Sequence, residues 1–354
     1  MKKLYKLVLI VGALILAASV FSACHGKEGV VKLKFTLIND DTEYEVTATS
    51  ANGEVVIPET YKNKPVTSIA NYAFNNRDKV TSVRIPASIK RVGNYAFFGA
   101  WGATLIFAGK QPPSQNNEFV FVKAIIVPNE AVGAYKAAWS DFSGKIYSAS
   151  DVRDDKYLIV NNTLISYFGY ADGGDAVDIP VDLTGIGQVA FRYNDNLKSV
   201  NIPEGITGIG STAFSACNGL REITVASGNK NYASECGILY NKSKTAFVVV
   251  PFAITGDVAV ADGITFIGGD FFKHRSLMTS VTLPDSVTGI GTEAFLNCTG
   301  LNSIVIPLSV TRILSNAFDG CGRLTINAHA AEQPSGWESD WNPDERPVVW
   351  GYAG

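Results

Sequence analysis

Residues 283–307 have the sequence LPDSVTGIGTEAFLNCTGLNSIVIP, and the main features of this stretch recur along the chain. The most regular feature is a phenylalanine that lies five residues after an Ile or Val. It occurs at Phe74, Phe97, Phe191, Phe214, Phe272, Phe295 and Phe318. Adjacent copies, such as Phe295 and Phe318, are 23 residues apart. A short fixed period predicts a solenoid, in which stacked coils complete one another's core.

Each repeat is expected to contain one short strand. Alternation turns Ile304 and Ile306 toward the interior, and it turns Ser303 and Val305 toward the outside. Pro307 then ends the strand, because proline has no N–H to donate to a neighbouring strand. The same pair of an apolar residue and a proline occurs eight times in the chain, so proline here mainly marks strand ends.

A glycine and a phenylalanine define the second half of the repeat. Gly291 follows Ile290, and glycine permits a tight backbone bend. Ala294 and Phe295 are expected on a short helical turn, with the ring filling the interior between the strand and the outer wall. Burial of such a ring contributes about 1.5–3 kcal/mol. The pattern therefore predicts a β-rich repeat solenoid with one phenylalanine inside each regular coil.

Three cysteines follow the repeat phenylalanines at a fixed distance of three residues. These are Cys217, Cys298 and Cys321. A position fixed by the repeat is expected to be a buried packing position. A disulfide between Cys217 and Cys236 remains open, whereas a metal site is not expected, because the chain has no CxxC motif or Cys/His cluster.

These residues together resemble the BspA-type leucine-rich repeat, which also occurs in Treponema-type surface proteins. The best copies lie at residues 197–220 and 283–324, the opening repeat at 56–69, an insertion at 126–142 and the terminal segment at 337–352. The resemblance implies a right-handed β/α superhelix with short parallel strands and short helical or 3-10 turns. It also implies a bacterial cell-surface protein, a class often linked to adhesion or host contact.

The N-terminus has the features of an export signal. The first six residues carry three lysines, and an apolar run over residues 7–18 follows them. The stretch Phe21-Ser22-Ala23-Cys24 resembles a bacterial lipobox, with Phe21 at a position where leucine is usual. The resemblance implies cleavage after residue 23 and acylation of Cys24, which would anchor the protein in a membrane. An uncleaved N-terminal anchor helix is the alternative.

The expected organisation is a single solenoid with bulges and a bend near residue 150. After the signal peptide at 1–23, residues 24–53 form an anchor linker and a capping hairpin. Residues 54–150 hold repeats and an irregular insertion with its own helix. Residues 151–327 hold further repeats with small hairpin bulges, which are expected near 156–170 and 228–241. Residues 328–354 form a C-terminal cap, in which the tryptophans close the core.

The sequence offers no constellation typical of an enzyme. The three histidines, His25, His274 and His329, lie near no Ser or Cys in a nucleophile motif. No glycine-rich phosphate loop or calcium-loop spacing occurs. We therefore expect a non-catalytic protein without a cofactor or metal. Removal of residues 1–23 takes three lysines away and changes the formal charge from −3 to −6, which argues against nucleic acid as a partner.

The outer face of the predicted sheet is the candidate binding surface. It should carry small and polar side chains: Ser82, Arg84, Ser199, Asn201, Glu222, Thr224, Ser280, Thr282 and Ser303. Such a face suits broad contact with an extracellular protein or glycan, although Ser and Thr also simply tolerate exposed strands. The leading hypothesis is an exported, lipid-anchored monomer at the bacterial surface that acts in adhesion. A glycan-binding accessory for nutrient uptake is the alternative.

Overall fold

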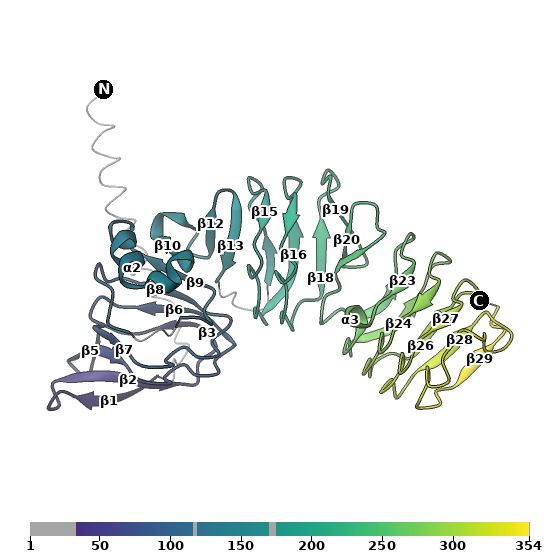
Figure 1. Ribbon diagram of the computed structural model, residues 1–354, viewed down its shortest axis with the longest axis horizontal. Helices are drawn as coiled ribbons and strands as arrows, with labels where there is room; N and C mark the ends of the chain where they lie inside the picture. The colour runs from purple at the N-terminus through teal and green to yellow at the C-terminus, as the bar shows by residue number, and fades with distance from the viewer. Residues whose placement is uncertain (1–32, 116–118, 170–174, 354) are drawn as a thin grey trace, which may run out of the picture. The chain divides into compact units, whose positions relative to one another are not determined.

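The computed structural model describes residues 33–115, 119–169 and 175–353, and the protein is rich in β-structure, with 36% strand and 7% helix. The chain divides into two compact units, unit 1 (Met1–Tyr170) and unit 2 (Ala171–Gly354) (Figure 1). The division falls at residues 170–171, and the bend expected near residue 150 stays a prediction. The signal peptide and Cys24 lie outside the described residues.

Unit 1 opens with an antiparallel hairpin of β1 and β2, at the place where alternating apolar residues predict one. Its turn is formed by Asn39, Asp40 and Asp41, all with positive φ, a conformation that these residue types tolerate. The sheet has the order β1-β2-β5-β4, and β7 also pairs with β5. The strands are β1 (Leu33–Ile38), β2 (Glu43–Thr49), β4 (Thr60–Tyr61), β5 (Lys64–Ile69) and β7 (Arg91–Val92).

A second sheet in unit 1 is parallel throughout and has the order β10-β9-β8-β6-β3. The strands are β3 (Gly53–Val56), β6 (Val80–Ile85), β8 (Thr104–Phe107), β9 (Ala124–Val127) and β10 (Ile146–Ser148). Between β9 and β10 lies the helix expected for the insertion. The helical segments between these strands are η1 (Asn129–Ala131), α2 (Val132–Ala138) and η2 (Ser140–Lys145), and η3 (Ala149–Asp151) follows β10. Tyr135 of α2 is fully buried in the core of unit 1.

An antiparallel hairpin of β12 and β13, with β11 paired to β12, packs on the outer side of this parallel sheet. The strands are β11 (Val152–Arg153), β12 (Tyr157–Val160) and β13 (Thr163–Tyr167). Ile106 and Ile126, which point away from the main core, form a separate buried cluster with Leu158 and Phe168. The central strands of this parallel sheet are therefore buried on both faces. The alternation of apolar and polar residues along the strands did not predict this.

Unit 2 contains two parallel sheets built from successive repeats, with the orders β14-β16-β18 and β22-β24-β26-β28-β29 (Figure 1). The first holds β14 (Asp175–Asp178), β16 (Leu197–Ile202) and β18 (Glu222–Val225). The second holds β22 (Gly256–Ala259), β24 (Met278–Thr282), β26 (Ser303–Ile306), β28 (Thr325–Ala328) and β29 (Val348–Trp350). A proline follows β14, β16, β24 and β26 within two residues, and β18, β22 and β28 end at the same place in their coils without a proline. The strand β29 belongs to the C-terminal segment and does not follow this pattern.

The repeat isoleucines five residues before each phenylalanine form additional two-residue strands, which the sequence did not predict. They pair in parallel between coils. They are β15 (Gly185–Ile186), β17 (Gly208–Ile209), β23 (Phe266–Ile267), β25 (Gly289–Ile290) and β27 (Arg312–Ile313). The bulge expected near 228–241 is a three-stranded antiparallel sheet of β19 (Tyr232–Glu235), β20 (Ile238–Asn241) and β21 (Phe247–Val249).

The repeat phenylalanines form the interior of both units, as the 23-residue period predicts. All seven are buried, and six of them are fully buried. Rings of adjacent coils stack face to face. For example, the Phe295 ring lies 5.3 Å from that of Phe272 and 5.4 Å from that of Phe318. Offset or tilted stacking at this separation is favourable beyond the burial itself.

The turns that carry these rings differ from the expected helical turn. Phe272 ends the short helix α3 (Gly269–Phe272), but the other six phenylalanines lie in turns without helix. The reason is visible around Phe295, where Glu293 and Asn297 have φ values of 56° and 57°. A left-handed residue on each side interrupts the right-handed helix.

The repeat glycine serves close packing between coils and not a special backbone angle. Gly93 and Gly210 do not have positive φ. A Cβ at Gly210 would lie 2.4 Å from Cα of Gln188 in the preceding coil, and one at Gly93 would lie 2.5 Å from the backbone N of Asn71. A side chain at either position would therefore collide with the preceding coil, whereas a Cβ at Gly268 would have no neighbour closer than 3.8 Å.

The three repeat cysteines are buried thiols, as predicted, and each one bonds to the preceding coil. The Sγ atoms of Cys217, Cys298 and Cys321 donate to the carbonyl oxygens of Phe191, Phe272 and Phe295, at 2.9, 3.1 and 3.0 Å. Cys236 is an exposed free thiol, so the disulfide with Cys217 does not form.

The C-terminal tryptophans close the core of unit 2. Trp337 and Trp341 are both 4% exposed, and the Trp341 ring packs edge-on against Phe318 at 5.8 Å. The indole Nε1 of Trp337 donates to the carbonyl oxygen of Val310 at 3.1 Å. Both side chains are therefore used in packing, which agrees with an end cap and removes them as candidates for ligand stacking.

Candidate functional site

The outer face of the first sheet in unit 2 brings four of the predicted residues together. Ser199 of β16 pairs with Glu222 of β18, and Asn201 pairs with Thr224. Ser199 is half-buried, and the other three side chains are exposed. The inward neighbours on these strands are buried, as the alternation requires. The predicted outward orientation is therefore correct for these residues, while their role in binding stays a prediction.

Some polar groups of this face bond to one another from coil to coil. Asn201 Nδ2 donates to Asp178 Oδ1 at 3.4 Å, and Thr224 Oγ1 donates to Asn201 Oδ1 at 3.3 Å. Both bonds join residues 23 positions apart. Asn201 is thus held in place by its neighbours, whereas no hydrogen bond between Ser199 or Glu222 and another described side chain is found.

The second sheet of unit 2 has a similar outer face. Ser280 pairs with Ser303 across β24 and β26. Ser280 Oγ and Thr279 Oγ1 donate to Asp257 Oδ1 at 2.7 and 2.8 Å. These hydrogen bonds, the one from Ser280 first, hold the pKa of the exposed Asp257 carboxyl below its usual value. Thr282 is exposed on the same strand.

The prediction that Ser82 and Arg84 belong to an exposed binding face is wrong. Ser82 is 1% exposed and Arg84 is 8% exposed, because the hairpin of β12 and β13 covers the outer side of this sheet. Thr104, the strand partner of Ser82, is bonded to Ser166 of β13 at 3.0 Å in a buried contact. Arg84 also forms an ion pair with Glu54. The outer face of this sheet is therefore part of the interior of unit 1.

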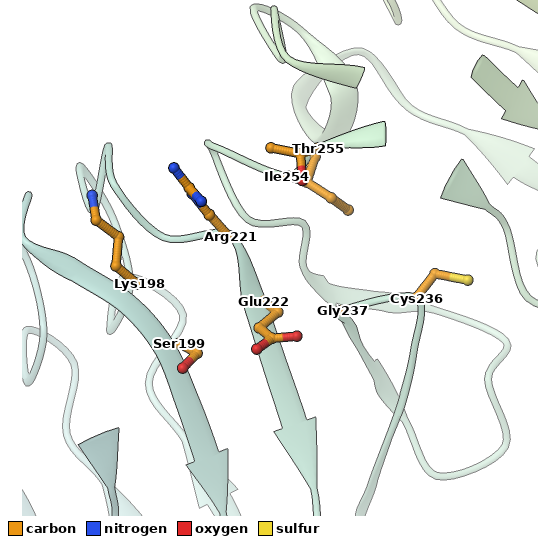
Figure 2. A pocket seen from close by; sticks show the side chains of 8 residues that line it. All are labelled: Lys198, Ser199, Arg221, Glu222, Cys236, Gly237, Ile254 and Thr255. Carbon is orange, nitrogen blue, oxygen red and sulfur yellow. The ribbon is translucent and has the colours of Figure 1, made fainter. Parts of the chain in front are cut away.

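An open pocket of about 410 Å³ lies on the first sheet of unit 2 (Figure 2). Its lining consists of Lys198, Ser199, Arg221, Glu222, Cys236, Gly237, Ile254 and Thr255. Figure 2 shows Lys198 and Ser199 on one strand, with Glu222 beside them on the next and Arg221 directly before that strand. Cys236 and Gly237 form the turn between β19 and β20, where both have positive φ. The backbone N–H of Ile223 donates to the carbonyl oxygen of Gly237 at 2.8 Å, which fixes this turn against β18.

The pocket combines two cations, one carboxylate and one thiol on an open surface. Lys198 and Arg221 lie one residue before Ser199 and Glu222, at equivalent places in two repeats. Their spacing of 23 residues was a usable signal that the sequence reasoning missed. The contribution of Cys236 depends on how the β19–β20 turn folds back, and no local pattern predicts that. Such a mixture of charges can bind a complementary polar surface. The lining of the pocket contains no histidine to serve as a general base.

The described residues contain neither a candidate metal site nor a candidate membrane-spanning helix. No group of three or more His, Cys, Asp or Glu side chains in residues 33–115, 119–169 and 175–353 could hold a metal ion. In the same ranges, no helix has the length and apolar character needed to cross a bilayer. His274 is exposed, and His329 is half-buried beside Tyr352.

Comparison with known protein families identifies the type of repeat. A family model described as the BspA type leucine rich repeat region matches in six copies, over residues 52–121, 166–250 and 258–331. The chain belongs to this family. The matched ranges include all seven repeat phenylalanines, so the BspA-type repeat accounts for the packing unit of both unit 1 and unit 2.

Solved structures of bacterial leucine-rich repeat proteins are similar to this chain. A leucine rich cell surface protein from Faecalibacterium prausnitzii A2-165 is 23% identical, with 85% of this chain and 88% of that chain covered and a TM-score of 0.35. A leucine-rich repeat protein from Bacteroides ovatus is 18% identical, with 92% and 100% covered and a TM-score of 0.37. The pneumococcal vaccine antigen PcpA is 16% identical, with 92% and 85% covered and a TM-score of 0.36. No curated protein sequence matches.

Proposed function

We propose that this BspA-type protein is a non-catalytic, monomeric cell-surface protein that binds an extracellular macromolecule and acts in adhesion. The observation that carries the proposal is the outer face of unit 2 around β16 and β18. Ser199 and Glu222 have polar atoms available there, and Lys198 and Arg221 add two cations at the rim of the pocket. A flat, polar and charged surface of this kind is typical of transient protein contacts.

Charge reversal on this face tests the proposal. We expect Glu222→Lys and Thr224→Lys to weaken capture of extracellular matrix proteins by the purified protein, as measured by pull-down. Thr265→Lys is the matched control, because Thr265 is also an exposed threonine of unit 2 but lies outside this face. Absence of binding to any of these probes, or equal binding by all three variants, contradicts the proposal.

We further propose that the protein is anchored to the outer face of a bacterial membrane through Cys24. Support comes from the lipobox-like stretch that ends at Cys24 and follows an apolar run with lysines before it. Growth with labelled palmitate should label the protein, and Cys24→Ala should lose the label. Label retained in the variant refutes the anchor.

A further inference from the structure

Five aromatic side chains form a continuous row on the surface of unit 1. The row consists of Tyr72, Tyr95, Phe98, Phe121 and Trp101. The centroid distances between neighbouring rings are 5.4, 5.9, 4.6 and 4.5 Å in this order. Tyr72 and Tyr95 are 54% and 46% exposed, Phe98 and Trp101 are 39% and 38% exposed, and Phe121 is half-buried. This aromatic row is unlike the core phenylalanines, because its rings meet solvent.

The repeat register creates the row. Tyr72 and Tyr95 each precede a core phenylalanine by two residues, so they occupy the same place on successive coils. The backbone N–H of Tyr72 donates to the carbonyl oxygen of Asn94 at 3.1 Å, which holds the two coils in step and the two rings parallel within 17°. Phe98, Trp101 and Phe121 continue the row through the turns that lead to β8 and β9.

The backbone under the two tyrosines is strained. Tyr72 and Tyr95 have φ values of 59° and 54°. At the same place in two repeats of unit 2, Asn316 and Glu293 have φ values of 57° and 56°. Asparagine tolerates this left-handed conformation, and a bulky side chain does so only at a cost in free energy. Stability alone would favour asparagine at both tyrosine positions, and strained residues of this kind concentrate at binding sites.

The dimensions of the row restrict what can bind there. Full burial of an aromatic side chain covers about 150–250 Å², so the exposed fractions of the four outermost rings leave roughly 400 Å². A stable interface with a globular protein needs about 800 Å² on each side. The row is therefore too small for a standard protein partner, but its adjoining rings can be contacted one after another by a chain ligand.

The chemistry of the row is apolar on the ring faces and neutral at its edges. None of the five side chains carries a charge, the tyrosines add two hydroxyls, and Asn71 and Asn94 are exposed beside them. A pyranose ring presents an apolar C–H face that packs on an aromatic ring, while its hydroxyls require neutral hydrogen-bonding groups nearby. A neutral sugar chain meets both requirements, and an anionic ligand would find no cation among the five rings.

We propose that the aromatic row binds a neutral glycan chain, whose sugar rings pack their C–H faces against the solvent-exposed parts of the aromatic side chains. The inference rests on the proposed function only in placing the protein outside the cell. It concerns a surface of unit 1, which shares no residue with the face around β16 and β18. It deepens the proposed function by naming the class of one ligand.

The test uses the purified protein on an array of neutral oligosaccharides, followed by calorimetric titration with the best-bound one. Tyr95→Asn and Trp101→Ala are each expected to weaken binding about tenfold or more, because a few aromatic anchors dominate such contacts. Val120→Asn is the matched control, since Val120 is 56% exposed and lies next to Phe121 without contributing a ring. Tyr95→Asn should also leave the urea midpoint unchanged or raise it, because it relieves the strained backbone.

The outcomes separate this inference from the proposed function. Failure of every neutral oligosaccharide to bind, or unchanged binding by Tyr95→Asn and Trp101→Ala, overturns the glycan assignment. Loss of a protein partner in these two variants, without any glycan binding, also overturns it. Glu222→Lys should leave glycan binding intact, so a defect of that variant in matrix-protein capture bears only on the face in unit 2.

Discussion

Removal of the Phe295 ring tests whether stacked phenylalanines hold the coils of unit 2 together. The side chain is fully buried and stacks on Phe272 at 5.3 Å and on Phe318 at 5.4 Å. Truncation of a core Phe to Ala costs about 3–5 kcal/mol. Two lost ring contacts, each worth about 0.5–1.5 kcal/mol beyond burial, place Phe295→Ala near the upper end, at about 5 kcal/mol. Folded domains are stable by only about 5–15 kcal/mol, so this loss is large.

Urea unfolding followed by far-ultraviolet circular dichroism measures the effect. Phe252→Ala is the control, because Phe252 is 39% exposed in the same unit and its ring lies 5.1 Å from the Arg275 guanidinium. We expect it to cost about 1 kcal/mol or less. Because each coil contacts only its neighbours, Phe295→Ala should also reduce the slope of the transition, as the coils on either side begin to unfold separately. A midpoint shift for Phe295→Ala no larger than that for Phe252→Ala would refute the stacking argument.

Three further predictions concern packing, thiol access and pH. Gly210→Ala should lower the free energy of unfolding by about 1–3 kcal/mol, because its Cβ meets backbone of the preceding coil, whereas Gly322→Ala, with open space around it, should have little effect in the same urea titration. A maleimide reagent should label Cys236 in the native protein, while labelling of Cys298 should require denaturant, because that thiol is buried. Hydrogen bonds from two hydroxyls depress the pKa of Asp257, so its contribution to stability should be present above the usual value of 3.8 and be lost as the pH falls through the depressed pKa. Asp257→Asn should therefore flatten the dependence of the unfolding midpoint on pH in the acid range, and an unchanged dependence would contradict this assignment.

The sequence predicts the interior of this protein well because interior packing is repeated. A ring at a fixed period has to fill the same space in each coil, and Phe74 and Phe318, near the two ends of the array, are both fully buried. Trp337 and Trp341 lie beyond the last repeat phenylalanine, where the open end of a solenoid needs cover. The hairpin of β1 and β2 follows from its alternation and from the residues in its turn.

The outer surface is predicted less well because alternation gives the side to which a residue points, and not what packs on that side. Ser82 and Arg84 do point outward from their sheet, but the hairpin that covers them comes more than 60 residues later in the chain. The neighbouring strand β9 offers a signal in retrospect. Its sequence, Ala124-Ile125-Ile126-Val127, is apolar at every position, as expected for a strand buried on both faces.

The aromatic row also lay beyond the sequence reasoning, which treated the turns only as connections. Tyr72 and Tyr95 share one place in the repeat, where Asn316 stands in unit 2. The unusual residue at a shared place was visible in the sequence. That the two tyrosines meet Phe98 and a chain of further rings depends on the close approach of the coils.

The identical junctions between coils have a consequence for the history of the gene. Thr207 Oγ1 donates to the carbonyl oxygen of Thr184, and Thr288 Oγ1 donates to that of Thr265, both at 3.1 Å and both across one 23-residue step. Recombination between two copies that gains or loses one whole step would leave a complete junction on each side of the splice. Variants of different length should therefore arise readily among related strains, whereas insertions of other lengths are expected only where they leave the stack as a bulge, as β19–β21 does.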